Sequence, residues 1–165
     1  MSHSLVHRVC SALTVGAGVT AAWIVAGPDA AAAPVAACPA PGATTVSAGD
    51  ATSQCSASSV GGSAAAAYGM DGTASADAGA TSLALALARN GGTATAQSSF
   101  LSGPAAIALG PGATVNATGV RPGLAIGIAG PGATVTVSGV DGPTCTGGVG
   151  FAGDFQTLQG CLSTR

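Results

Sequence analysis

Cysteine is the residue type whose number and spacing point most directly to a defined chemistry in this chain. Of five cysteines, four lie beyond residue 32, as one pair near each end of that portion: Cys38, Cys55, Cys145 and Cys161. An even number of cysteines in an exported chain is typical of disulfides. Four cysteines allow three pairings, and we expect the local pairs Cys38–Cys55 and Cys145–Cys161. Each such cross-link would contribute roughly 3 kcal/mol of stability in the chain-entropy model.

Side chains that act as general acids and bases are scarce. Lysine and glutamate are absent from the sequence, and both histidines, His3 and His7, lie near its start. A serine or cysteine nucleophile further along would have no histidine to activate it. The aspartates beyond residue 32 have no spacing that recommends a catalytic pair or a repeated calcium site: Asp50, Asp71, Asp77, Asp141 and Asp154. We therefore expect no enzymatic activity, no cofactor and no metal site.

The charge of the chain excludes a second class of function. Four arginines stand against six aspartates, and aromatic residues make up 3% of the sequence. Scattered arginines with few aromatics do not form a nucleic-acid-binding surface. The weak net charge of −2 instead favours self-association or a place in the cell envelope.

The first 32 residues have the pattern of a secretory signal peptide. A mildly basic start ends at Arg8, an apolar stretch covers 9–26, and Pro28 then stops the helix because proline lacks an amide donor. Alanines at 30–32 fit a small-residue cleavage site. The pattern predicts a signal helix over 1–32, a mature chain from Ala33, and export to the extracellular space or cell envelope.

Two other interpretations of this region stay open. The apolar run of 18 residues is just long enough to span a bilayer, so it could be an uncleaved anchor. The segment Val35-Ala36-Ala37-Cys38 has the letters of a bacterial lipobox, which would place a lipid anchor on Cys38. Proline and aspartate between the apolar run and this segment favour the cleaved leader.

A repeat of 20 residues dominates 63–140. The motif Gly-Pro-Gly-Ala-Thr-Val occurs at 110–115 and again at 130–135, and related segments lie further back at 91–96 and 71–76. Each of the four units has an apolar run, a glycine- or proline-containing turn, and a run in which small apolar and hydroxyl residues alternate. Period-two alternation bounded by glycine and proline predicts strands.

Two short strands and two tight turns per unit predict an all-β fold, a short parallel β-solenoid or β-roll. One unit cannot bury its own apolar face, but stacked units can. We expect a thin core lined by alanine, valine, leucine and isoleucine, with an antiparallel meander of hairpins as the alternative fold. The leucines change from odd positions at Leu83 to even positions at Leu124. A bulge near 121–123 would restore the register.

The same pattern predicts the organisation of the chain beyond the leader. Residues 33–62 would form a partly loose segment with Cys38 and Cys55, and 63–140 the four repeats. Residues 141–165 would form a C-terminal cap with the other two cysteines.

Threonines are placed to form rows in such a solenoid: Thr93, Thr95, Thr114, Thr134 and Thr136. A flat face of this kind could hold a small or extended ligand, and its ladders resemble ice-binding surfaces. β-Branched hydroxyl residues also suit any solvent-facing strand position.

Two resemblances to known families follow from these segments. The units Ala-Ile-Ala-Leu-Gly-Pro-Gly-Ala-Thr-Val at 106–115 and its counterpart at 125–135 resemble the head repeats of trimeric autotransporter adhesins. That resemblance covers about 63–140 and implies a left-handed parallel β-roll, surface display and adhesion. Over its whole length, the chain resembles uncharacterised small secreted proteins of mycobacteria and related actinomycetes. The alanine-rich leader, the paired cysteines and the Gly-Pro-Gly repeats carry this second resemblance, which implies export but no activity.

These features predict a secreted or envelope-associated structural or interaction protein without enzymatic activity. The alternative is an extracellular ligand-binding module that uses the threonine-rich strand face.

Overall fold

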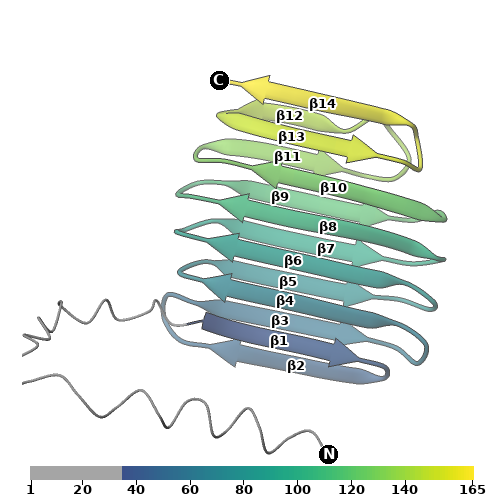
Figure 1. Cartoon of the computed structure of the whole chain (residues 1–165). Coiled ribbons are helices and arrows are strands. Elements are labelled where there is room, and N and C mark those ends of the chain that lie inside the picture. The colour runs from purple at the N-terminus through teal and green to yellow at the C-terminus, as the bar shows by residue number, and fades with distance from the viewer. Residues whose placement is uncertain (1–34) are drawn as a thin grey trace, which may run out of the picture. The chain divides into compact units, whose positions relative to one another are not determined.

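All the regular structure of the described chain is β-strand. The computed structural model describes residues 35–165, which fold into two seven-stranded sheets (Figure 1). The signal helix and cleavage site expected within 1–33 lie outside the described residues. Within 35–165, no helix is long and apolar enough to cross a membrane.

The two sheets, called sheet A and sheet B, lie face to face. Sheet A has the order β1 (Val35–Pro41), β4 (Ala64–Met70), β6 (Leu83–Arg89), β8 (Ser102–Leu109), β10 (Gly123–Ala129), β13 (Val149–Asp154) and β14 (Gln159–Thr164). Sheet B has the order β12 (Thr144–Gly147), β11 (Ala133–Val137), β9 (Thr114–Gly119), β7 (Thr93–Ser98), β5 (Thr73–Ala78), β3 (Gln54–Ser59) and β2 (Thr44–Gly49).

The centre of each sheet is parallel. The chain alternates between sheets, so that β4, β6, β8 and β10 pair in parallel in one sheet and β3, β5, β7, β9 and β11 in the other. This is a β-solenoid of about four turns with a repeat of about 20 residues, as the sequence predicted.

The repeat length varies at one corner of the coil only. Two residues connect β4 to β5, three connect β6 to β7, four connect β8 to β9 and three connect β10 to β11. In the longest of these connections, Gly112 has a left-handed φ of 70° after Pro111. The opposite corner keeps a constant length, since Ser59, Ala78, Ser98 and Gly119 stack in register. The predicted bulge at 121–123 is therefore wrong. The turn at 110–113 contains the extra residue, which therefore does not enter the strand pairing. As a result, the large apolar residues of β10 face the same side of the sheet as those of β6, although their positions change from odd to even.

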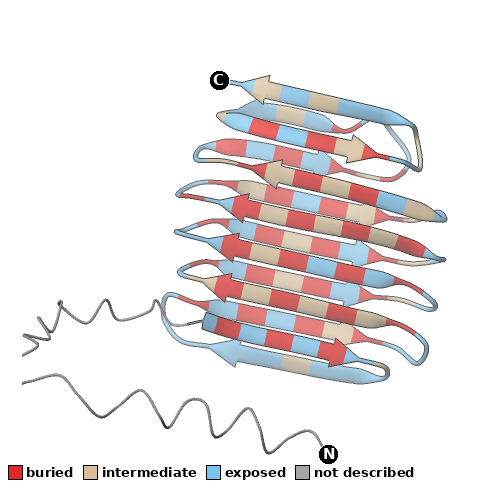
Figure 2. Ribbon diagram, viewed as in Figure 1, coloured by how far each residue is buried: buried red, intermediate tan, exposed pale blue. Residues whose placement is uncertain are grey.

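Alanine fills the core of this solenoid. Buried and exposed residues alternate along the strands (Figure 2), and 21 of the 26 buried apolar residues within 35–165 are alanine. The other five are Val115, Val135, Val137, Cys38 and Cys55. The predicted core of leucine and isoleucine is wrong, because these side chains point outward.

The small distance between the sheets explains this exclusion. At one end, the disulfide holds the Cα atoms of Cys38 in sheet A and Cys55 in sheet B 5.8 Å apart, as disulfide geometry requires. Further along, a Cβ added to Gly127 would come within 2.7 Å of a methyl group of Val115 in the opposite sheet. The interior therefore accepts a valine only opposite a glycine, and a leucine does not fit.

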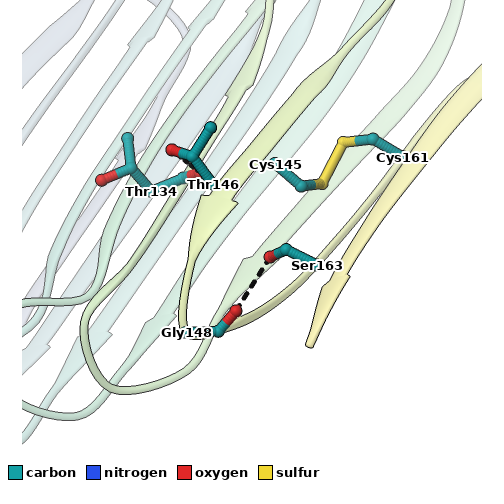
Figure 3. Close-up of a disulfide and its surroundings, with 6 residues drawn as sticks. All are labelled: Thr134, Cys145, Thr146, Gly148, Cys161 and Ser163. Atoms are coloured by element: carbon teal, nitrogen blue, oxygen red, sulfur yellow. Dashed lines mark hydrogen bonds between the residues drawn. A yellow bond between two sulfur atoms is a disulfide. The ribbon is translucent and has the colours of Figure 1, made fainter. Parts of the chain in front are cut away.

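Antiparallel strands close both ends of the solenoid. At one end β1 pairs with β4 and β2 with β3; at the other, β13 pairs with β10, β14 with β13 and β12 with β11. Much of the segment expected to be partly loose, 33–62, thus consists of strands β1, β2 and β3. The disulfides Cys38–Cys55 and Cys145–Cys161 each join sheet A to sheet B at one end. Figure 3 shows the second of them, between Cys145 and Cys161.

Candidate interaction surfaces

Several of the residues within 35–165 whose side chains could take part in chemistry have structural roles. All four cysteines are in disulfides. Asp50 accepts hydrogen bonds from the backbone amides of Thr52 and Ser53 at 2.8 and 2.9 Å, and the Ser53 amide, then Thr52, lowers the pKa of its carboxyl. Buried Asp154 accepts from the Gln156 amide and the Thr157 hydroxyl. No three metal-binding side chains cluster in this part of the chain.

A ladder of buried serines, which the sequence analysis missed, closes the corner of constant length. Ser63 donates to the Val60 carbonyl at 2.7 Å, Ser82 to the Gly79 carbonyl at 2.8 Å, and Ser102 to the Gly119 carbonyl at 2.9 Å. Ser82 and Ser98 also bond to each other at 2.8 Å. These bonds satisfy buried backbone acceptors that would otherwise cost stability. The serines at 63, 82 and 102 are visible in the sequence and are the signal from which this ladder could have been predicted.

The outer surface of sheet A, here called the apolar face, carries the large side chains excluded from the core. One row of them crosses six neighbouring strands in register: Tyr68, Leu87, Ile107, Ile128, Phe151 and Leu162. We call it the apolar row. Phe151 is 46% exposed and Leu162 is 71% exposed. Contiguous apolar surface of this kind commonly marks an interaction site.

A shallow hollow lies beside the apolar row. It has a volume of about 340 Å³, and its lining includes Leu83, Leu85 and Leu124 together with small residues such as Ala66 and Gly103. These residues stand two or four positions before the row on strands β4, β6, β8 and β10. The apolar row and the hollow thus lie side by side on the apolar face.

Charge is nearly absent from the apolar face. Among the described residues of sheet A, the outward side chains include one charged group, that of Arg89, at the end of β6. Asp154, at the end of β13, is buried instead.

The outer surface of sheet B, here called the hydroxyl face, has the opposite chemistry. Five threonines follow Gln54 in one row across β5, β7, β9, β11 and β12: Thr73, Thr93, Thr114, Thr134 and Thr146. The adjacent row contains Ser56, Ser75, Thr95, Asn116, Thr136 and Thr144. All five threonines singled out from the sequence lie on this face. Neighbouring hydroxyls along a row are about 4.8 Å apart, the spacing of strands in a sheet.

These features define a class of protein, a disulfide-closed β-solenoid with two outer faces of opposite polarity. Residues 2–164 match the model of DUF6764, a family of unknown function, and the chain belongs to this family. Comparisons with curated proteins and with solved structures give no significant match. None of these findings bears on the resemblance to adhesin heads or to actinobacterial secreted proteins.

The two disulfides indicate where such a chain resides. Disulfides form and persist in oxidising compartments and are rare in the reducing cytosol. The pairs Cys38–Cys55 and Cys145–Cys161 therefore point to an oxidising, extracytoplasmic environment.

Proposed function

We propose that this protein is exported and acts without catalysis, as a structural or interaction protein in the cell envelope or beyond it. The observation that carries the proposal is the apolar row, which runs across strands β4 to β14 on the outside of the fold. Within a soluble domain such side chains normally lie in the core. Because these side chains face outward, they form a surface that a partner can cover.

The composition supports a role without catalysis. Beyond His7 the sequence contains no histidine, lysine or glutamate, the usual proton donors and acceptors of enzymes. Both disulfides and the signal-peptide pattern support export. Membership of the family leaves the role open, since its function is unknown.

The export half of the proposal is tested by N-terminal sequencing of the protein recovered from culture fluid and from the envelope fraction. We expect a chain that begins at Ala33. An intact Met1 would instead identify a retained anchor, and a lipid on Cys38 a lipoprotein; either would contradict the cleaved leader.

The interaction half is tested by comparing the association of variants with purified envelopes. The variant Leu87→Thr, Ile107→Thr and Ile128→Thr makes the apolar row polar, and threonine is a β-branched residue that suits strands. We expect it to lose association, whereas the matched control on the hydroxyl face, Thr95→Val and Thr136→Val, retains it. Equal association of both variants would contradict the assignment of the apolar face.

A second candidate function is the binding of an extended polar ligand, such as a polysaccharide, on the hydroxyl face. The specific observation is the row of five threonines in register on parallel and antiparallel strands. A ligand with polar groups repeated at the strand spacing would meet a hydroxyl on every strand. Co-sedimentation with purified cell-wall polysaccharide tests this idea, and Thr95→Leu with Thr136→Leu is expected to abolish binding.

A further inference from the structure

We propose that two copies of this chain pair through their apolar faces, sheet A against sheet A, about a two-fold axis parallel to the stack of strands. This inference rests on the proposed function and deepens it, because it identifies a second copy of the chain as the partner of the apolar face. The argument comes from the area, the charge and the shape of that face.

The area of the face is sufficient for a dimer. Sheet A has seven strands, and six intervals of about 4.8 Å give a width of about 29 Å. Strands of about seven residues, at about 3.3 Å each, extend for roughly 20 Å across it. Each copy would therefore bury about 600 Å², and the pair about 1,200 Å². A specific interface needs about 1,000 Å² in total.

The chemistry of the face matches that of an interface between identical subunits. Such interfaces are depleted of charge and resemble a domain core cut in half. Arg89 is the one charged outward side chain of sheet A within 35–165, and it stands at a strand end. The row includes the aromatic residues Tyr68 and Phe151, a type enriched at the energetic centres of interfaces.

Exposure of the remaining leucines adds a driving force. Leu83 is 61% exposed and Leu124 is 63% exposed. The narrow gap between the sheets gives these side chains no place inside their own copy. Pairing of faces removes them from water, which stabilises the assembly in proportion to the apolar area covered.

The shape of the face is complementary to itself. The apolar row lies on one side of the Ala105 column, and Gly103 in the lining of the hollow lies on the other. A two-fold axis parallel to the stack reverses the strand direction, so the row of one copy lies over the hollow of the other. An axis along the strands would place row against row. The first arrangement lets the side chains of Leu87 and Ile107 enter the partner's hollow, as a self-complementary contact requires.

This geometry predicts which residue meets its own counterpart. The column of the hollow's lining that stands next to the row runs along the axis, and β8 is the central strand of sheet A. Ala105 lies in that column, paired with Leu85 on one side and Ile126 on the other. Ala105 of one copy should therefore face Ala105 of the other.

Two measurements on the purified product of the full chain test the pairing. In sedimentation velocity over a concentration series, we expect the wild type to be a dimer. The triple variant Leu87→Thr, Ile107→Thr and Ile128→Thr should be a monomer with a dissociation constant at least tenfold weaker, and Thr95→Val with Thr136→Val should remain a dimer. Circular dichroism establishes that each variant keeps its β structure.

The second measurement does not depend on weakening the interface. Ala105→Cys is expected to oxidise to a covalent dimer, whereas Thr95→Cys, on the central strand of sheet B, is expected to stay a single chain. A monomeric wild type, or cross-linking of both cysteine variants to the same extent, would overturn the pairing.

Lipid is the competing occupant of the face. A wild type that is monomeric and sediments with phosphatidylglycerol vesicles, while the triple variant does not, would replace the pairing with a membrane-docking role. That result would leave the proposed interaction function standing. By contrast, a triple variant that behaves as the wild type in envelope, vesicle and sedimentation assays would overturn both.

Discussion

The apolar face and the hydroxyl face are built on the same backbone and the same interior, yet they carry opposite chemistry. Beneath the apolar face lie Ala84, Ala86 and Ala88, and beneath the hydroxyl face Ala94 and Ala96, all buried. Along the strands of sheet A, outward leucine or isoleucine alternates with inward alanine. Along the strands of sheet B, outward threonine or serine alternates with inward alanine. The distance between the sheets restricts the inner residues to small side chains. The outer residues are free of that restriction, and their difference is where a function can reside.

The largest change in stability should come from removing a disulfide that connects the two sheets. Cys145→Ala with Cys161→Ala removes the bridge between the edge strands β12 and β14 and should lower the free energy of unfolding by about 3 kcal/mol, because the open chain gains conformational entropy. Denaturant titration measures the change. A loss below about 1 kcal/mol would mean that hydrogen bonds at this end, such as Ser163 to Gly148 (Figure 3), already hold it closed.

A slightly smaller effect should follow from enlarging a core residue under either face. Ala86→Leu and Ala96→Leu replace fully buried alanines in sheets A and B, and each should cost about 2 kcal/mol through overpacking. The outward substitution Leu85→Ala is the control, and thermal unfolding should show a change of less than about 1 kcal/mol for it. If Leu85→Ala proved the more damaging change, the interior would not be limited in the way described.

Making the two faces alike should change association more than stability. Thr95→Leu with Thr136→Leu gives the hydroxyl face an apolar centre, so a protein that pairs through its apolar face, as proposed, would acquire a second association surface. We expect light scattering to detect species larger than the dimer, while the free energy of unfolding shifts by no more than about 0.5 kcal/mol. Thr95→Val with Thr136→Val, which adds less apolar surface, is the graded control. An unchanged mass for the leucine variant would show that apolar character alone does not determine pairing.

The smallest effect concerns a charge at the end of sheet B. Hydrogen bonds from the Ser53 and Thr52 amides lower the pKa of Asp50, so its carboxylate contributes stability at pH values above the ordinary aspartate pKa. This contribution is lost as the pH falls through the lowered pKa of the folded state. The melting temperature of Asp50→Asn should therefore be below that of the wild type near neutral pH and should converge with it in strong acid. A constant difference across the acid range would assign the effect to packing.

Much of the fold could be predicted because the repeat is visible in the sequence. Recurrence of the Gly-Pro-Gly turn at 110–112 and 130–132 indicated stacked coils of strand, and the structure has them. The residue types facing inward could not be assigned from alternation alone, since Leu83-Ala84-Leu85 fits either face. The usual preference of leucine for the core misled the assignment. Alanine was the better guide, because it alternates in both halves of a unit, as at 84–88 and 94–96.

Other features depended on contacts that a repeat does not encode. The antiparallel closing strands lack the motif, so nothing in 35–59 indicated that β1 and β2 would pair with β4 and β3. The apolar face could not be predicted from the sequence for a related reason. Once Leu87 and Ile107 were placed in the core, no large apolar residues were left for the surface. The threonine rows were found because a hydroxyl residue in a strand is expected to face water.

The corner whose connections vary between two and four residues has a consequence for engineering. Its connections lie outside the strand pairs, and backbone hydrogen bonds such as that from the Gly132 amide to the Pro111 carbonyl join neighbouring connections. Residues added there leave the strand pairs themselves in place. Foreign peptides inserted between Leu109 and Thr114 would therefore be displayed at the rim of the solenoid, without altering either face. Duplication of a whole unit would have a different result, widening both faces by one strand and turning the molecule into a scaffold of adjustable length.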